Sequence, residues 1–145
     1  MLKWIVVAAL TFAAVLLFMG ATASPEEQAQ ELTEINLKQL LKDPDSMKIK
    51  SSFIVKNPAD KNGNFDIAVC GIVDGKNGFG GYTGGIPFVG KSAVFNGETH
   101  FISVNIEDPT DKKNATQLKK LSAFEEIFWN EYCVDATHQK LQFKE

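Results

Sequence analysis

The chain has 145 residues, with 15 lysines against 18 acidic residues, a formal net charge of −3 and no arginine. Arginine is the usual reader of phosphate and carboxylate groups, and nucleic-acid binders are normally basic, so a nucleic acid or another polyanion is not expected as a partner. A genomic bias toward lysine would explain the missing arginine equally well. The length suits one domain with a single core.

Residues 1–23 have the three parts of an export signal. A lysine at position 3 gives a positive start, an apolar run follows, and Ala21-Thr22-Ala23 is a small-x-small cleavage site. Cleavage before Ser24 would leave one exported domain, residues 24–145, with 14 lysines, 18 acidic residues and a charge of −4. The predicted location is periplasmic or secreted. The alternative is an uncleaved anchor, because the 20 residues from Trp4 to Ala23 are enough to span a bilayer, and this is the only membrane contact expected.

Two cysteines, Cys70 and Cys133, lie in the exported part. An even number of cysteines in an exported protein predicts a disulfide, and two cysteines allow one intramolecular pairing. They are 63 positions apart, so the chain-entropy relation gives a stabilisation of about 4 kcal/mol. Because the chain has no Cys-x-x-Cys motif, we interpret the bond as structural and not catalytic.

Hydrophobic spacing in the first half predicts a helix and two strands. The helix covers residues 25–42 and ends at Asp43-Pro44-Asp45-Ser46, because proline disfavours helix at the preceding residue. Alternation predicts strands at 47–56 and 65–73, separated by a turn-rich loop. The first strand should have one apolar face, formed by Met47, Ile49, Phe53 and Val55, with Ile54 as the exception to the alternation. The second should place Cys70 opposite an apolar face of Phe65, Ile67, Val69, Gly71 and Val73.

The second half predicts a hairpin and a closing helix. Residues 74–90 contain seven glycines, so part of this stretch must be loop. Strands at 86–95 and 98–106 flank Asn96-Gly97, a strong hairpin signal. After Asp108-Pro109-Thr110-Asp111, a helix ending near Cys133 should bury Leu118, Leu121, Phe124, Ile127, Phe128 and Tyr132. The expected fold is α+β in the order α-β-β-β-β-α, a mostly antiparallel four-stranded sheet flanked by an N-terminal and a C-terminal helix.

Three motifs for nucleotide or calcium binding fail, the first on its structural context and the other two on missing residues. Residues 85–92 match the phosphate-loop pattern Gly-x-x-x-x-Gly-Lys-Ser, but a strand follows instead of a helix, and Pro87 removes an amide that the phosphates need. Residues 78–83 have threonine where a dinucleotide fingerprint has its third glycine. Residues 60–71 begin like a calcium loop but place Phe65 at position six and Gly71 at position twelve. We therefore expect no nucleotide, metal or cofactor.

The sequence contains no assembled set of catalytic residues. His100 alternates with Ile102, Val104 and Ile106, so we expect a buried or edge-packed histidine, and His138 lies in a polar tail. There is no Gly-x-Ser-x-Gly nucleophile motif and no pair of histidines at metal-ligand spacing. A hydrolase of an envelope polymer that uses dispersed Asp and Glu side chains is the enzymatic alternative.

The glycine-rich stretch 76–84 sets two aromatic residues among four glycines. Aromatic side chains on a loop offer a large contact area at low entropy, and neighbouring amide and hydroxyl groups add hydrogen bonds. The candidate binding residues are Lys76, Asn77, Phe79, Tyr82 and Thr83. In the alternative interpretation the two rings plug the sheet edge and the glycines only permit unusual backbone angles.

Four segments carry a resemblance to a known set of sequences. They are Leu41-Lys42-Asp43-Pro44-Asp45-Ser46, Cys70-Gly71-Ile72-Val73 with Lys76-Asn77, Phe79-Gly80-Gly81-Tyr82-Thr83-Gly84, and Phe128-Trp129-Asn130 with Cys133. The chain resembles a widespread set of small, uncharacterised exported bacterial proteins with Leu-Lys-Asp-Pro-x-Ser, Cys-Gly-x-Val-x-x-Lys-Asn and Gly-Gly-Tyr-Thr-Gly motifs and a late cysteine. Asp74 departs from this pattern, which has asparagine there. The resemblance implies a bacterial envelope location and supports the disulfide, but it brings no reaction or ligand.

The leading prediction is a non-enzymatic exported domain that binds a protein or another envelope component through the Phe79–Tyr82 loop. A carboxylate-based hydrolase and a purely structural envelope protein are the two alternatives.

Overall fold

The structure is a computed structural model that describes residues 23–143, so residues 1–22 of the predicted export signal lie outside it. The elements are α2 (Pro25–Leu40), η1 (Pro44–Ser46), β1 (Lys48–Lys56), β2 (Phe65–Asp74), β3 (Ile86–Phe95), β4 (Glu98–Ile106), α3 (Pro109–Gln117), η2 (Glu125–Trp129) and α4 (Asn130–Tyr132). The predicted α+β class and the order of helix, four strands and closing helices are confirmed.

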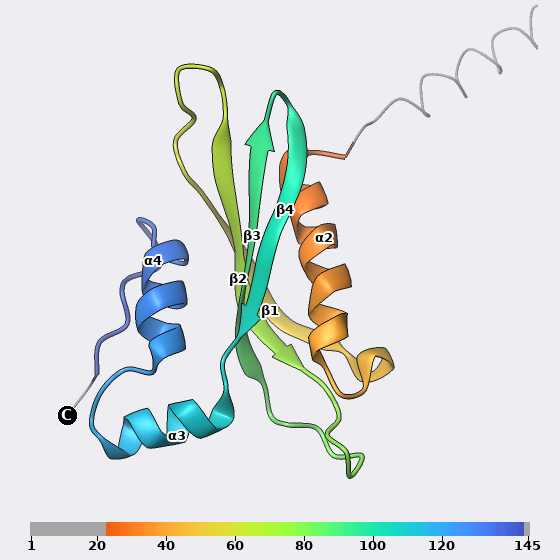
Figure 1. Ribbon diagram of the computed structural model, residues 1–145, viewed down its shortest axis with the longest axis vertical. Coiled ribbons are helices and arrows are strands. Elements are labelled where there is room, and N and C mark those ends of the chain that lie inside the picture. Colours follow the sequence, from red (N-terminus) through yellow and green to blue (C-terminus); the bar gives the residue numbers. More distant parts are fainter. Residues whose placement is uncertain (1–22, 144–145) are drawn as a thin grey trace, which may run out of the picture.

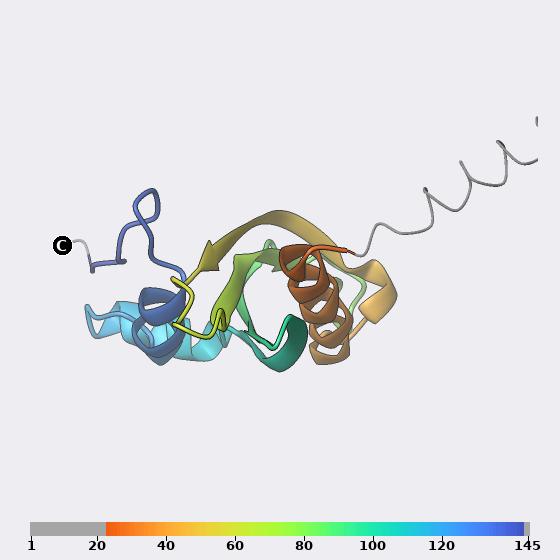
Figure 2. The same cartoon turned by 90° about the horizontal axis from the view of Figure 1, so that it is seen from above.

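The four strands form one antiparallel sheet in the order β1-β2-β3-β4. Helix α2 packs mainly against β4, and the C-terminal helices lie on the other side of the sheet (Figure 1). Figure 2 shows the sheet curving around α2. Each side has its own apolar cluster, one beneath α2 and one around the disulfide.

Helix α2 starts at a complete capping box. The Ser24 hydroxyl accepts the Glu27 N–H at 3.2 Å, and the Glu27 carboxylate accepts the Ser24 N–H at 2.7 Å. Thr33 lies on the buried face of the helix, directly over Gly90 of β3. A Cβ atom at Gly90 would be 2.3 Å from the Thr33 side chain, so only glycine permits the helix to approach the sheet this closely.

The hairpin between β3 and β4 forms where the sequence predicts it. Asn96 and Gly97 both have positive φ, 52° and 81°, which is the backbone that a two-residue primed turn requires. Both strands have the predicted bounds. The prediction for β2 is also confirmed, because Cys70 lies in the cluster on the side of the sheet opposite α2.

A bulge in β4 overturns the prediction for His100. Two successive residues of β3 pair with Ser103 and Phe101, so Ile102 is an extra residue in the strand. An extra residue reverses the alternation of side chains. Val104 therefore packs on the α2 side, whereas His100 lies on the other face with a side chain that is 56% exposed. The prediction of a buried or edge-packed histidine at position 100 is therefore wrong.

A bulge in β1 also reverses the alternation of side chains, so the apolar residues of this strand do not share one face. The pairing with β2 skips Lys50. Met47 and Ile49 consequently pack with the α2 cluster, while Phe53 and Val55 pack with the disulfide cluster. The single apolar face predicted for this strand is wrong.

The C-terminal region is two helical segments and not the one predicted helix. Asp108, expected only to end the strand, caps α3 by accepting the N–H groups of Thr110 and Asp111 at 2.7 and 3.1 Å. The second segment contains the π-helical turn η2, which changes the spacing at which side chains share a face. Phe124 is buried, but Leu118 and Ile127 are exposed, so the predicted apolar stripe is only partly correct.

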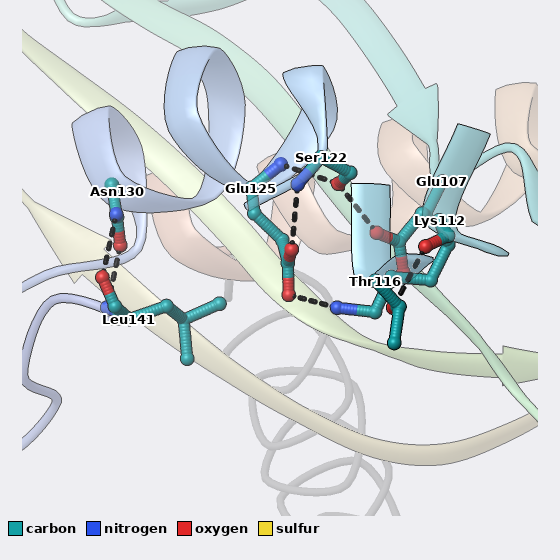
Figure 3. A network of polar contacts seen from close by, with 7 residues as sticks. All are labelled: Glu107, Lys112, Thr116, Ser122, Glu125, Asn130 and Leu141. Carbon is teal, nitrogen blue, oxygen red and sulfur yellow. Dashed lines mark hydrogen bonds and ion pairs between the residues drawn. The ribbon is translucent and has the colours of Figure 1, made fainter. Parts of the chain in front are cut away.

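A polar network ties this region to the end of β4 (Figure 3). The Ser122 hydroxyl accepts the Glu125 N–H at 3.1 Å and donates to Glu107 at 2.6 Å, and Lys112 forms an ion pair with Glu125. Burial acts to raise the pKa of Glu125, but the hydrogen bonds from Lys112 and Ser122 outweigh it, so the pKa lies below its usual value. Asn130 also fixes the tail that follows α4: its side-chain amide donates to the Leu141 carbonyl, and its side-chain oxygen accepts the Leu141 N–H.

The predicted disulfide between Cys70 and Cys133 is present. The two Cα atoms are 5.9 Å apart, and both residues are fully buried. The bond joins the second strand of the sheet to the end of α4, which places it at the centre of the cluster on that side.

Candidate functional site

The glycine-rich loop between β2 and β3 is anchored by one buried carboxylate. Asp74 Oδ1 accepts four hydrogen bonds, from the main-chain N–H groups of Gly75, Thr83 and Gly84 at 2.9, 3.0 and 3.2 Å and from the Thr83 hydroxyl at 3.0 Å. Burial acts to raise the pKa of Asp74, but these donors outweigh it and the pKa lies below its usual value. The base of the loop is therefore closed around a negative charge.

The tip of the loop is closed by Asn77. Its side-chain oxygen accepts the N–H groups of Phe79 and Gly81 at 2.9 and 3.1 Å, and its main chain exchanges hydrogen bonds with Gly80 and Gly81. Gly80 has a φ of 82°, which glycine adopts without strain. The tip is thus an ordered turn over residues 77–81.

The two aromatic residues of the loop have different surroundings. Phe79 is fully exposed at the tip. Tyr82 is 42% exposed and pairs with Lys76 in a short β-bridge, and the Lys48 ammonium lies 4.3 Å from its ring centroid. Neither ring belongs to an apolar cluster of the described residues. The two rings therefore do not pack against the edge of the sheet as the alternative interpretation expects.

A groove lies beside the loop at the C-terminal end of α2, and we call it the loop groove. It has a cavity volume of about 360 Å³. Its apolar lining consists of Leu40, Leu41, Ile86, Ile106 and Pro109. Its polar lining consists of Lys42, Lys76, Asn77, Thr83 and Asp108 together with Gly75. Three of the five predicted binding residues therefore line one concavity, whereas Phe79 and Tyr82 lie outside it.

The segment after α2 forms part of this site. The Ser46 hydroxyl accepts the Lys76 N–H at 2.7 Å and donates to the Asp43 carbonyl at 2.7 Å. A Cβ atom at Gly75 would lie 3.3 Å from Leu41, so the loop packs tightly on this segment. Two of the motifs that carry the sequence resemblance are therefore brought together in space.

Reasoning from the sequence missed the remaining wall of the groove. Ile106 and Pro109 come from the junction between β4 and α3. Nothing in the local pattern of these residues indicates a site. Their contribution follows from the order of the strands, which places the end of β4 next to the start of β3.

The residues of the other candidate motifs have structural roles. Residues 86–92 lie within β3, where their main chain pairs with the neighbouring strands. Asp60 accepts the N–H groups of Asn62 and Asn64 and closes the β1–β2 turn. The His138 ring stacks on Phe53 at 3.7 Å and contacts Asp135. Within residues 23–143 there is no cluster of three or more metal-ligating side chains.

No protein-family model, curated protein or solved structure matches this chain. The resemblance to small exported bacterial proteins consequently stays a prediction. Among the helices of residues 23–143, none combines the length and the apolar character that a membrane crossing needs.

Proposed function

We propose that this protein is an exported bacterial envelope protein, periplasmic or secreted, whose domain binds a protein or another envelope component without catalysing a reaction. The observation that carries the proposal is the fully exposed Phe79 on a loop held by Asp74 and Asn77. An ordered loop has little backbone entropy left to lose on binding, an aromatic side chain has few rotatable bonds, and aromatic residues are enriched among those that contribute most at recognition surfaces.

One observation supports an extracytoplasmic location, and a second is compatible with the expected processing. The buried Cys70–Cys133 disulfide is a type of bond that persists in oxidising compartments. The expected cleavage before Ser24 would also leave the residue whose hydroxyl caps α2, so the processed domain keeps its first helix intact.

Binding explains the loop better than either alternative. A hydrolase acting at this loop would use the carboxylates beside it, but Asp74 accepts four hydrogen bonds from the loop and Asp108 caps α3. A purely structural loop would bury its aromatic rings, and Phe79 is fully exposed.

The test is a crosslinked pull-down from the envelope with wild type, Phe79→Ala and Phe95→Ala. Phe95 is a matched control, because its ring is 55% exposed and lies at the opposite end of β3. A partner recovered with wild type and Phe95→Ala but lost with Phe79→Ala supports the proposal. Equal recovery with all three folded proteins contradicts it.

A further inference from the structure

We propose that the loop groove binds a short peptide segment that places an apolar side chain beside a carboxylate. This inference rests on the proposed function and specifies the chemistry of the partner. The groove has the size of a ligand site, since such sites range from about 300 to 1,000 Å³ and are lined mostly by apolar groups with a few placed polar ones. Its apolar lining, which includes Leu40, Ile86 and Ile106, is suited to one aliphatic or aromatic side chain.

The free charge at the rim of the groove is positive. Lys42 and Lys76 both line the groove, and neither forms an ion pair within residues 23–143. The Lys76 ammonium does lie 5.8 Å from the centroid of the Tyr82 ring, a contact that leaves its positive charge unneutralised. Asp108 is also at the rim, but its carboxylate accepts two N–H groups at the start of α3, where the helix dipole offsets its charge. A carboxylate next to the apolar group therefore complements the groove better than an ammonium.

The groove also carries partners for a peptide main chain. The Asn77 side-chain oxygen is engaged by the loop, which leaves the two N–H bonds of its amide to donate to a carbonyl. Helix α2 ends at Leu40, which lines the groove. The Lys38 carbonyl already accepts the Leu41 N–H at 3.3 Å, whereas the other carbonyls of the last turn lack an intrahelical partner and are of the kind that accepts N–H groups. A peptide main chain has the carbonyl and N–H groups that pair with such donors and acceptors, whereas a lipid tail has neither.

The experiment is an NMR titration of the protein recovered from exporting cells with three blocked hexapeptides. These are acetyl-Gly-Gly-Leu-Asp-Gly-Gly-amide and its Leu-Lys and Ser-Asp counterparts. The Leu-Asp peptide is expected to shift the amide signals of groove residues and to bind about fivefold more tightly than either counterpart, as one exposed ion pair or one small apolar contact would provide. Vesicles of phosphatidylglycerol are tested in parallel.

Charge reversal makes the test specific. In a Lys42→Glu, Lys76→Glu variant the preference should invert, so that the Leu-Lys peptide binds more tightly than the Leu-Asp peptide. A Lys113→Glu, Lys120→Glu variant, with the same charge change on exposed positions in and just after α3, should keep the wild-type preference. The titration of wild type is informative by itself. Equal binding of the three peptides, or amide-signal shifts that map to residues outside the groove, would overturn the inference.

The outcomes separate this inference from the proposed function. Sedimentation with vesicles that depends on Lys42 and Lys76, without peptide discrimination, would replace the peptide by a lipid surface and overturn the inference. A partner that still requires Phe79 would in that case leave the proposed function standing. If the peptides bind in the groove as expected but the envelope partner does not depend on Phe79, the inference about the groove stands and the proposed function of the Phe79 loop fails.

Discussion

Replacing both cysteines with alanine is expected to lower the free energy of unfolding by about 4 kcal/mol. The bond closes a segment of 63 residues, and loop-closure entropy for that length gives this value at 25 °C. Other connections of the C-terminal helices to the sheet are the side chains of Phe124, Phe128, Trp129 and Tyr132 and the hydrogen bond from Ser122 to Glu107 at the end of β4. At a slope of about 2 kcal/mol per molar urea, the unfolding midpoint should fall by about 2 M.

Two probes make this assay more informative. The Trp129 ring of η2 packs edge-on against Phe53 of β1, with the ring centroids 6.0 Å apart, so its fluorescence reports docking of the C-terminal segment, while circular dichroism reports the whole fold. Reductant should bring wild type to the midpoint of the Cys70→Ala, Cys133→Ala variant and should leave that variant unchanged. A loss below about 1 kcal/mol, or a variant that still responds to reductant, would refute the reasoning.

Further predictions concern the second strand and the loop. Gly71→Ala should cost about 3 kcal/mol in thermal unfolding, because its Cβ would lie 2.2 Å from a main-chain oxygen of β1, whereas Gly78→Ala, in open space, should be neutral. Asp74→Ala should speed hydrogen exchange of the Thr83 and Gly84 amides, and Asp74→Asn should preserve more protection. Because the pKa of Asp74 is lowered, its anchoring should persist at neutral pH and disappear only as the pH falls through that lowered pKa; loss of the Thr83 amide shift near pH 6 would contradict this.

Local signals in the sequence were sufficient for much of the fold. Asn96-Gly97 specified the hairpin because both positions need positive φ, and the flanking alternation specified its strands. The disulfide followed from export and a count of two cysteines. The bulges at Lys50 and Ile102 reverse every side chain beyond them. In the sequence they appear only as apolar residues out of phase with the alternation, Ile54 and Phe101, and such a residue does not show at which position the extra residue lies.

The candidate site was predictable only in part. Glycines around two aromatics indicated an exposed loop, and Lys76, Asn77 and Thr83 do line a concavity. The groove itself depends on three segments that meet through tertiary packing, so no local pattern contains it. The role of Asp74 was also hidden, because a carboxylate buried by its own loop has the same sequence context as an exposed one.

Photo-crosslinking in living cells tests the central claim most directly. A benzoylphenylalanine replaces Phe79 in one strain and Phe95 in another, so that the same reactive group is exposed at opposite ends of the sheet. The account predicts a discrete covalent adduct from position 79 and none from position 95. No adduct at either position, or the same adducts at both, would contradict recognition through the glycine loop.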